Sequence, residues 1–123
     1  MAKSEAEVRA ILKDEKTRFL RLVFSDIHGV IKNVEVPDTQ FDKALAGEIM
    51  FDGSSIEGFV RIQESDMLLR PDPDSLRIIP QDKGVEDHRR ATLICDVALP
   101  DGQPFPGCPR HVLRRAIERA AAS

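Results

Sequence analysis

Two short segments with apolar residues at alternate positions lie on either side of Asp26-Ile27-His28-Gly29. An alternation of period two predicts β-strands at 18–24 and 30–36, because successive strand side chains point to opposite faces. A turn that ends in glycine between two such segments is typical of a β-hairpin. We therefore expect a hairpin with His28 as a solvated residue at its tip. The expected inward side chains are Leu20, Leu22, Phe24, Val30, Val34 and Val36.

Helical spacing occurs at both ends of the chain. Ser4 and Glu7 have the spacing of a capping box and predict a helix from about residue 4 to residue 14. Pro109 suits the first position of a final helix that runs to the end of the sequence. One face of that helix is apolar and the opposite face is rich in arginine.

A shorter helix is expected directly after the hairpin. Phe41, Ala44 and Leu45 have helical spacing, Asp38 or Thr39 can cap the start, and a glycine at position 47 can end it. Further strands are predicted at 67–69, 76–79 and 92–97.

These elements predict an α+β fold, a small and mostly antiparallel sheet with a packed helix, flanked by N- and C-terminal helices. We divide the chain into an N-terminal helix at 1–16, a sheet domain at 17–108 and the start of a helix at 109–123.

Composition excludes several functions. A net charge of −3 and a pI near 5.6 give no basic footprint for nucleic acid. The sequence contains no long apolar run and no signal peptide, so we expect a cytoplasmic protein without membrane contact. Cys95 and Cys108 have neither metal-site nor disulfide spacing, and we expect reduced thiols, with only Cys95 in the core. Phosphate-binding glycine loops and catalytic triads are also missing, so no complete active site is expected.

The stretch 51–71 carries the most distinctive chemistry. An apolar run delivers Asp52 into the turn Gly53-Ser54-Ser55, where a polar group can be held without being buried. Taken alone, this is an ordinary turn between two strands. The order Asp-Gly-Ser-Ser, then Glu64-Ser65-Asp66-Met67, then Pro71-Asp72, closely resembles the N-terminal signature of the glutamine synthetase family. The likeness also covers 24–29, 94–97 and 100–105.

That resemblance implies the β-grasp domain that begins bacterial-type glutamine synthetases. It also implies roles for individual residues. Asp52 matches the catalytic aspartate that holds ammonium and helps it lose a proton, and Ser55 matches a supporting substrate-binding residue. Asp66 matches a substrate-binding acid near the cleft, although it can instead cap a turn. Arg61 matches a regulatory arginine associated with glutamine feedback inhibition, with an exposed strand arginine as the alternative. No metal ligand is expected in this chain.

Members of the family join ammonia to glutamate at the expense of ATP, with Mg²⁺ or Mn²⁺ bound in a catalytic domain. The resemblance therefore implies a parent ligase in a ring of identical subunits, where this domain completes the neighbouring subunit's active site. Its partners there are other subunits, ammonium and glutamate, and the chain alone is expected to be inactive and without a cofactor. Two alternatives remain: a stand-alone interaction or assembly module, and the N-terminal domain of a related γ-glutamyl ligase for another amine.

Overall fold

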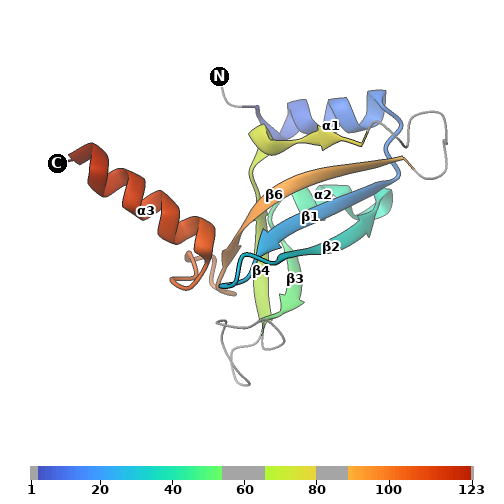
Figure 1. Ribbon diagram of the computed structural model, residues 1–123. Helices are drawn as coiled ribbons and strands as arrows, with labels where there is room; N and C mark the ends of the chain where they lie inside the picture. The colour runs from blue at the N-terminus through green and yellow to red at the C-terminus, as the bar shows by residue number, and fades with distance from the viewer. Residues whose placement is uncertain (1–2, 54–65, 80–88, 123) are drawn as a thin grey trace.

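The computed structural model describes residues 3–53, 66–79 and 89–122. The elements follow the order predicted from the sequence (Figure 1). They are α1 (Glu5–Asp14), β1 (Phe19–Ser25), β2 (Ile31–Pro37), α2 (Phe41–Leu45), β3 (Ile49–Asp52), β4 (Asp66–Pro71), β5 (Arg77–Ile78), β6 (Arg90–Ala98) and α3 (Pro109–Ala122). Short 3₁₀ turns occupy Asp38–Gln40 and Pro73–Ser75.

The described strands form one six-stranded sheet in the order β2-β1-β6-β4-β3, with β5 paired to β6. Only the pairing of β1 with β6 is parallel, and the other described pairings are antiparallel. This confirms the predicted α+β class with a mostly antiparallel sheet. The parallel pair at the centre needs a long crossover, which the chain supplies through α2, β3 and β4.

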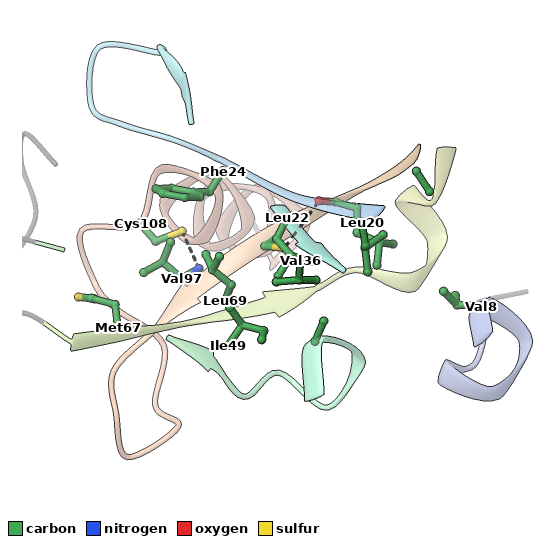
Figure 2. Close-up of a cluster of buried hydrophobic side chains, with 14 of the residues drawn as sticks. Val8, Leu20, Leu22, Phe24, Val36, Ile49, Met67, Leu69, Val97 and Cys108 are labelled. Carbon is green, nitrogen blue, oxygen red and sulfur yellow. Dashed lines mark hydrogen bonds between the residues drawn. The ribbon is translucent and has the colours of Figure 1, made fainter. Parts of the chain in front are cut away.

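One face of the sheet holds the core (Figure 2). Leu20 and Leu22 of β1 and Leu93 of β6 are fully buried there, as the period-two pattern predicts. Val8 and Leu12 of α1 cover this face. Burying a leucine side chain contributes roughly 1.5–3 kcal/mol, so this face supplies most of the stability of the fold.

The hairpin prediction is confirmed except for Val30, which is 50% exposed and precedes β2. The reason is the turn that Asp26 organises. Its Oδ1 accepts hydrogen bonds from the backbone amides of His28 and Val30, each at 2.9 Å. Because Val30 completes that turn, its side chain is not on the inner face of the strand. His28 is exposed at the tip, as expected.

The predictions for the helix ends are confirmed in part. Ser4 caps α1 by accepting a hydrogen bond from the Glu7 amide at 3.1 Å, as predicted. The predicted cap of α2 by Asp38 or Thr39 is wrong, because residues 38–40 form a 3₁₀ turn and no side chain caps α2. Gly47 follows α2 with a φ of 75°, a conformation that favours glycine.

The prediction that only one cysteine is buried is also wrong. Cys95 and Cys108 are both buried and both free. Cys108 lies in a Pro-flanked segment, but its Sγ accepts a hydrogen bond from the Val97 amide at 3.4 Å and so joins the core. Among the described residues, no helix has the length and apolar content needed to span a membrane.

Candidate functional site

The β3–β4 hairpin positions Asp52 by simple alternation. Ile49 is buried and Phe51 packs against the core, so Met50 and Asp52 point to the other face. Asp52 is the last residue of β3 and is exposed. The apolar residues on either side therefore fix the strand while leaving its carboxylate accessible to a ligand.

Asp66 lies directly opposite Asp52. The register pairs Ile49 with Leu69 and Asp52 with Asp66, and both acids are exposed. Opposite residues in an antiparallel pair have Cβ atoms about 4.5–5.5 Å apart, and two like charges there repel each other. This end of the β3–β4 pair thus carries two carboxylates whose combined negative charge can attract a cation.

An aromatic contact holds β3 beneath this carboxylate pair. The rings of Phe51 and of Phe24 on β1 have centroids 4.7 Å apart and are tilted by 38°. Such pairs contribute about 0.5–1.5 kcal/mol beyond the area they bury. The contact anchors the residue next to Asp52 to the core.

The other predicted site residues cannot be placed in the same way. Ser55 and Arg61 lie outside the described residues. The structure therefore brings together Asp52 and Asp66 but does not test the roles predicted for any of these four residues. Among the described residues, no group of three or more His, Cys, Asp or Glu side chains could hold a metal ion.

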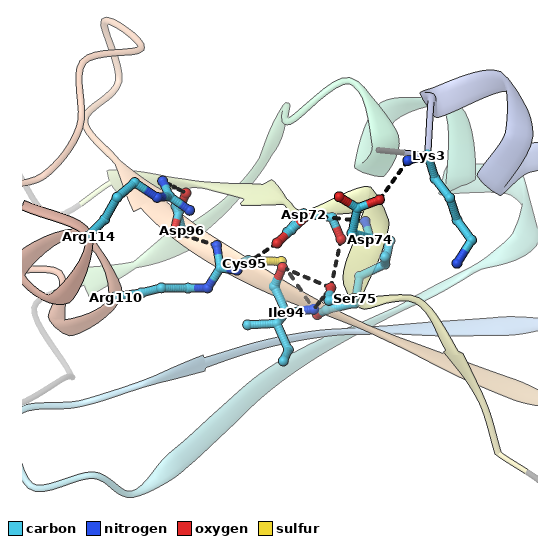
Figure 3. A network of polar contacts seen from close by, with 10 residues as sticks. Lys3, Asp72, Asp74, Ser75, Ile94, Cys95, Asp96, Arg110 and Arg114 are labelled. Atoms are coloured by element: carbon cyan, nitrogen blue, oxygen red, sulfur yellow. Dashed lines mark hydrogen bonds and ion pairs between the residues drawn. The ribbon is translucent and has the colours of Figure 1, made fainter. Parts of the chain in front are cut away.

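A second polar cluster joins α3 to the sheet (Figure 3). Nη2 of Arg110 lies 2.6 Å from Oδ2 of Asp72, and Nη1 lies 2.9 Å from Oδ1 of Asp96. Nη1 of Arg114 lies 2.6 Å from Oδ2 of Asp96. These four side chains are partly buried or, for Arg114, half exposed. We call them the junction network.

The junction network shifts the ionisation of its members. Burial of the Asp72 carboxyl opposes ionisation, but the Arg110 hydrogen bond and charge and the Asp74 amide outweigh it and lower the pKa of Asp72. Burial likewise opposes the charge on Arg110, but Asp96 and Asp72 outweigh it and raise the pKa of Arg110. Asp72 and Arg110 are therefore both charged at neutral pH.

Sequence reasoning missed the junction network. Its members lie just after β4, in β6 and in α3, and hydrogen-bonded partners are up to 38 residues apart in the sequence. Helical spacing correctly predicted an apolar stripe on α3, but Val112, Leu113 and Ile117 are 52%, 60% and 60% exposed. Charge contacts rather than buried apolar side chains therefore attach α3 to the described sheet.

Comparison with known proteins decides the family. The sequence profile "Glutamine synthetase, beta-Grasp domain" matches residues 16–100. The chain belongs to the glutamine synthetase β-grasp domain family. The match includes β1 to β6 and therefore the Asp52–Asp66 hairpin end.

Bacterial relatives agree with this assignment. The β-grasp chain is 62% identical over 122 residues to "Glutamine synthetase" from Thermus thermophilus, covering 97% of this chain and 27% of the relative. It is 53% identical over 117 residues to "Glutamine synthetase" from Clostridium saccharobutylicum, covering 94% of this chain and 26% of that protein. It thus spans about a quarter of the length of these relatives.

Solved structures show the same fold. The structure titled "GmaS/ADP complex-Conformation 1" superposes with a TM-score of 0.82 at 26% identity, covering 99% of this chain and 26% of the other. The Plasmodium falciparum glutamine synthetase superposes with a TM-score of 0.80 at 21% identity, covering 94% of this chain and 22% of the other. The β-grasp fold is therefore shared well beyond the bacterial relatives.

Proposed function

We propose that this β-grasp domain provides the ammonium-binding acids of an ATP-dependent glutamate–ammonia ligase. The observation that carries the proposal is the register that places Asp52 directly opposite Asp66 at the exposed end of the β3–β4 hairpin. Membership of the glutamine synthetase family supplies the reaction for which such a cation site is useful.

The physical argument concerns the charge of the substrate. Ammonium predominates at neutral pH, but only ammonia is nucleophilic. A carboxylate about 4 Å from a cation gains roughly 4 kcal/mol at an effective dielectric constant of 20. An ionised carboxylate can also accept a proton from the ammonium ion. Asp52 is proposed to do both, with Asp66 adding negative charge to the same site.

Two further proposals concern residues 55 and 61. Ser55 is proposed to support the substrate by hydrogen bonding. Arg61 is proposed to take part in feedback inhibition by glutamine. Both rest on the positions of these residues in the family signature.

The rest of the reaction is proposed to require parts that the longer relatives possess. ATP and Mg²⁺ or Mn²⁺ are proposed to bind in the remaining three-quarters of such a protein. Subunits are proposed to assemble into a ring in the cytoplasm, with the Asp52 end of one domain completing the site of its neighbour. Under this proposal the 123-residue chain alone does not form glutamine.

A fusion protein tests the proposal. The N-terminal quarter of the Thermus thermophilus glutamine synthetase is replaced by this chain, and glutamine formation from glutamate, ammonium and ATP is measured. We expect turnover from the fusion protein and none from the isolated chain. Asp14→Asn, a change at an exposed acid of α1, is the control. If the fusion protein keeps as much turnover with Asp52→Asn as with Asp14→Asn, the role assigned to Asp52 is contradicted.

The alternative of an assembly module makes a different prediction. The exposed apolar side chains of α3 favour contact with another protein surface. If assembly were the whole function, Asp52→Asn would leave the turnover of the fusion protein unchanged. The same experiment therefore distinguishes the two functions.

A further inference from the structure

Arg70 lies near the end of β4 that is remote from Asp66. Arg70 lies four positions after Asp66 along the strand, which corresponds to roughly 13 Å. Within the part of the chain that the structure describes, the Arg70 side chain forms no hydrogen bond or ion pair, whereas its backbone belongs to the β4–β6 ladder. A guanidinium group that no carboxylate engages can bind an oxyanion.

The acid that would ordinarily neutralise Arg70 is already engaged. Arg70 pairs in register with Asp96 across β4 and β6, so the two residues are direct cross-strand neighbours. However, Oδ1 of Asp96 contacts Arg110 at 2.9 Å and Oδ2 contacts Arg114 at 2.6 Å. Both oxygens of the carboxylate therefore already have a guanidinium partner.

Counting charges gives the same conclusion. The junction network contains two guanidinium groups and two carboxylates, so it is neutral by itself. Arg70 then adds one positive charge beside it. An anion at this position would balance that charge without breaking any existing ion pair.

Two glycines allow the Arg70 side chain to lie close to the backbone. A Cβ atom at Gly102 would lie 2.8 Å from Nη2 of Arg70, which is closer than real Cβ contacts. A Cβ at Gly47 would lie 3.3 Å from Cγ of Arg70. The stem and the guanidinium group therefore each pass over a glycine, which leaves room for the side chain beside the backbone.

A cavity of about 160 Å³ adjoins this guanidinium group. Its lining includes Arg70, Asp96, Gly102, Pro104, His111 and Arg114. The volume is below the roughly 300–1,000 Å³ of pockets for drug-sized ligands, so it suits a small ion. Guanidinium groups bind phosphate oxygens in a bidentate manner, and an imidazole N–H of His111 can donate another hydrogen bond.

We propose that this cavity binds a compact oxyanion of the phosphate class, with Arg70 as its principal ligand. Arg114 contributes positive charge and His111 contributes a hydrogen-bond donor, both from α3. The site is separate from the Asp52–Asp66 pair and does not depend on the proposed ammonium role. Because its ligands come from both β4 and α3, bound phosphate also adds a link between the sheet and that helix.

Titration of the 123-residue chain with inorganic phosphate tests this proposal, followed by the backbone amide signals of Gly102 and His111 in NMR spectra. Sodium chloride at matched ionic strength controls for screening. We expect saturable shifts with phosphate and none with chloride. Arg70→Gln is expected to raise the dissociation constant by about tenfold or more, since it removes charged hydrogen bonds.

Arg77→Gln is the matched control, because Arg77 is also an exposed strand arginine but lies on β5. It is expected to leave phosphate binding unchanged. If Arg70→Gln does not fold, Arg70→Lys replaces it and must still weaken binding more than Arg77→Gln does. The proposal would be overturned if phosphate binding were not saturable or if chloride caused equal shifts. It would also be overturned if the changes at positions 70 and 77 had equal effects on phosphate binding.

Discussion

Asp52, the last residue of β3, and Asp66, the first residue of β4, are direct cross-strand neighbours in an antiparallel pair. Such a pair of like charges does not stabilise a hairpin, since carboxylates in this position repel each other. The proposed ammonium role gives this arrangement a use that cross-strand pairing of two acids does not. Removing one of these two charges should weaken ammonium binding and raise the free energy of unfolding.

The first prediction follows for Asp66→Asn. Removing one charge should raise the free energy of unfolding of the isolated domain by about 0.2–1 kcal/mol. Urea unfolding at low salt measures this change, and added salt should reduce it. Asp14→Asn on α1 is the control and should have no comparable effect. A loss of stability in Asp66→Asn would mean that the pair is not repulsive in the folded domain.

The second prediction concerns Arg110, which contacts Asp72 and Asp96 and is only 29% exposed. Arg110→Gln should lower the free energy of unfolding by about 1–3 kcal/mol, because two partly buried carboxylates lose a charged partner. Arg115→Gln, an exposed change on the same helix, should cost less than about 0.5 kcal/mol. Equal effects of the two changes would show that the junction network does not hold α3.

A third prediction concerns the stability of the domain at low pH. Hydrogen bonds and cationic neighbours outweigh burial and lower the pKa of both Asp26 and Asp72 below the ordinary value of 3.8. Near pH 4 the unfolded chain therefore binds more protons than the native domain, so stability falls as the pH decreases further. The melting temperature should be nearly constant above about pH 5 and should drop below about pH 4.

The Arg110→Gln variant separates the two acids in that experiment. Without Arg110, the pKa of Asp72 should move towards its ordinary value, and the loss of stability in acid should become shallower. The Asp26 contribution should remain, because its partners are the amides of His28 and Val30 together with Lys32. An identical acid profile in the variant and the parent would contradict the assigned cause.

A fourth prediction concerns the two thiols. Burial raises the pKa of Cys95 to about 12, and Cys108 is only 2% exposed. Neither thiol should react with a disulfide reagent in the native domain at pH 8, whereas both should react in urea. A stopped-flow assay follows the thiolate that leaves the reagent and so measures the reaction rate of the protein thiols under each condition. Rapid reaction of one protein thiol under native conditions would show that the segment around Cys108 opens readily.

Local patterns were sufficient to predict most of the fold. The alternation in β1, the glycine after α2 and the Ser4 cap depend on neighbouring residues, and each is confirmed. Val30 was misplaced because its hydrogen bonds with Asp26, rather than its apolar side chain, determine its position. Cys108 was misplaced because flanking prolines suggested a surface loop.

The candidate site, like the fold, was predicted from the sequence only in part. Family signature residues led directly to Asp52 and Asp66, but their opposition across a hairpin is a matter of strand register. A period-two pattern assigns a residue to one face of its strand, but its partner on the next strand also depends on the geometry of the connection between them. The junction network and the Arg70 cavity are also long-range arrangements, and no local pattern predicts them.

The fifth prediction tests the central claim about ammonium most directly. In the fusion protein with the Thermus thermophilus relative, kcat/KM for ammonium is measured with and without Asp52→Asn, together with KM for ATP. We predict that kcat/KM for ammonium falls by about 100-fold or more, the usual scale for losing a proton acceptor, while KM for ATP stays constant. An unchanged kcat/KM for ammonium in the Asp52→Asn protein would contradict the proposed role of this carboxylate.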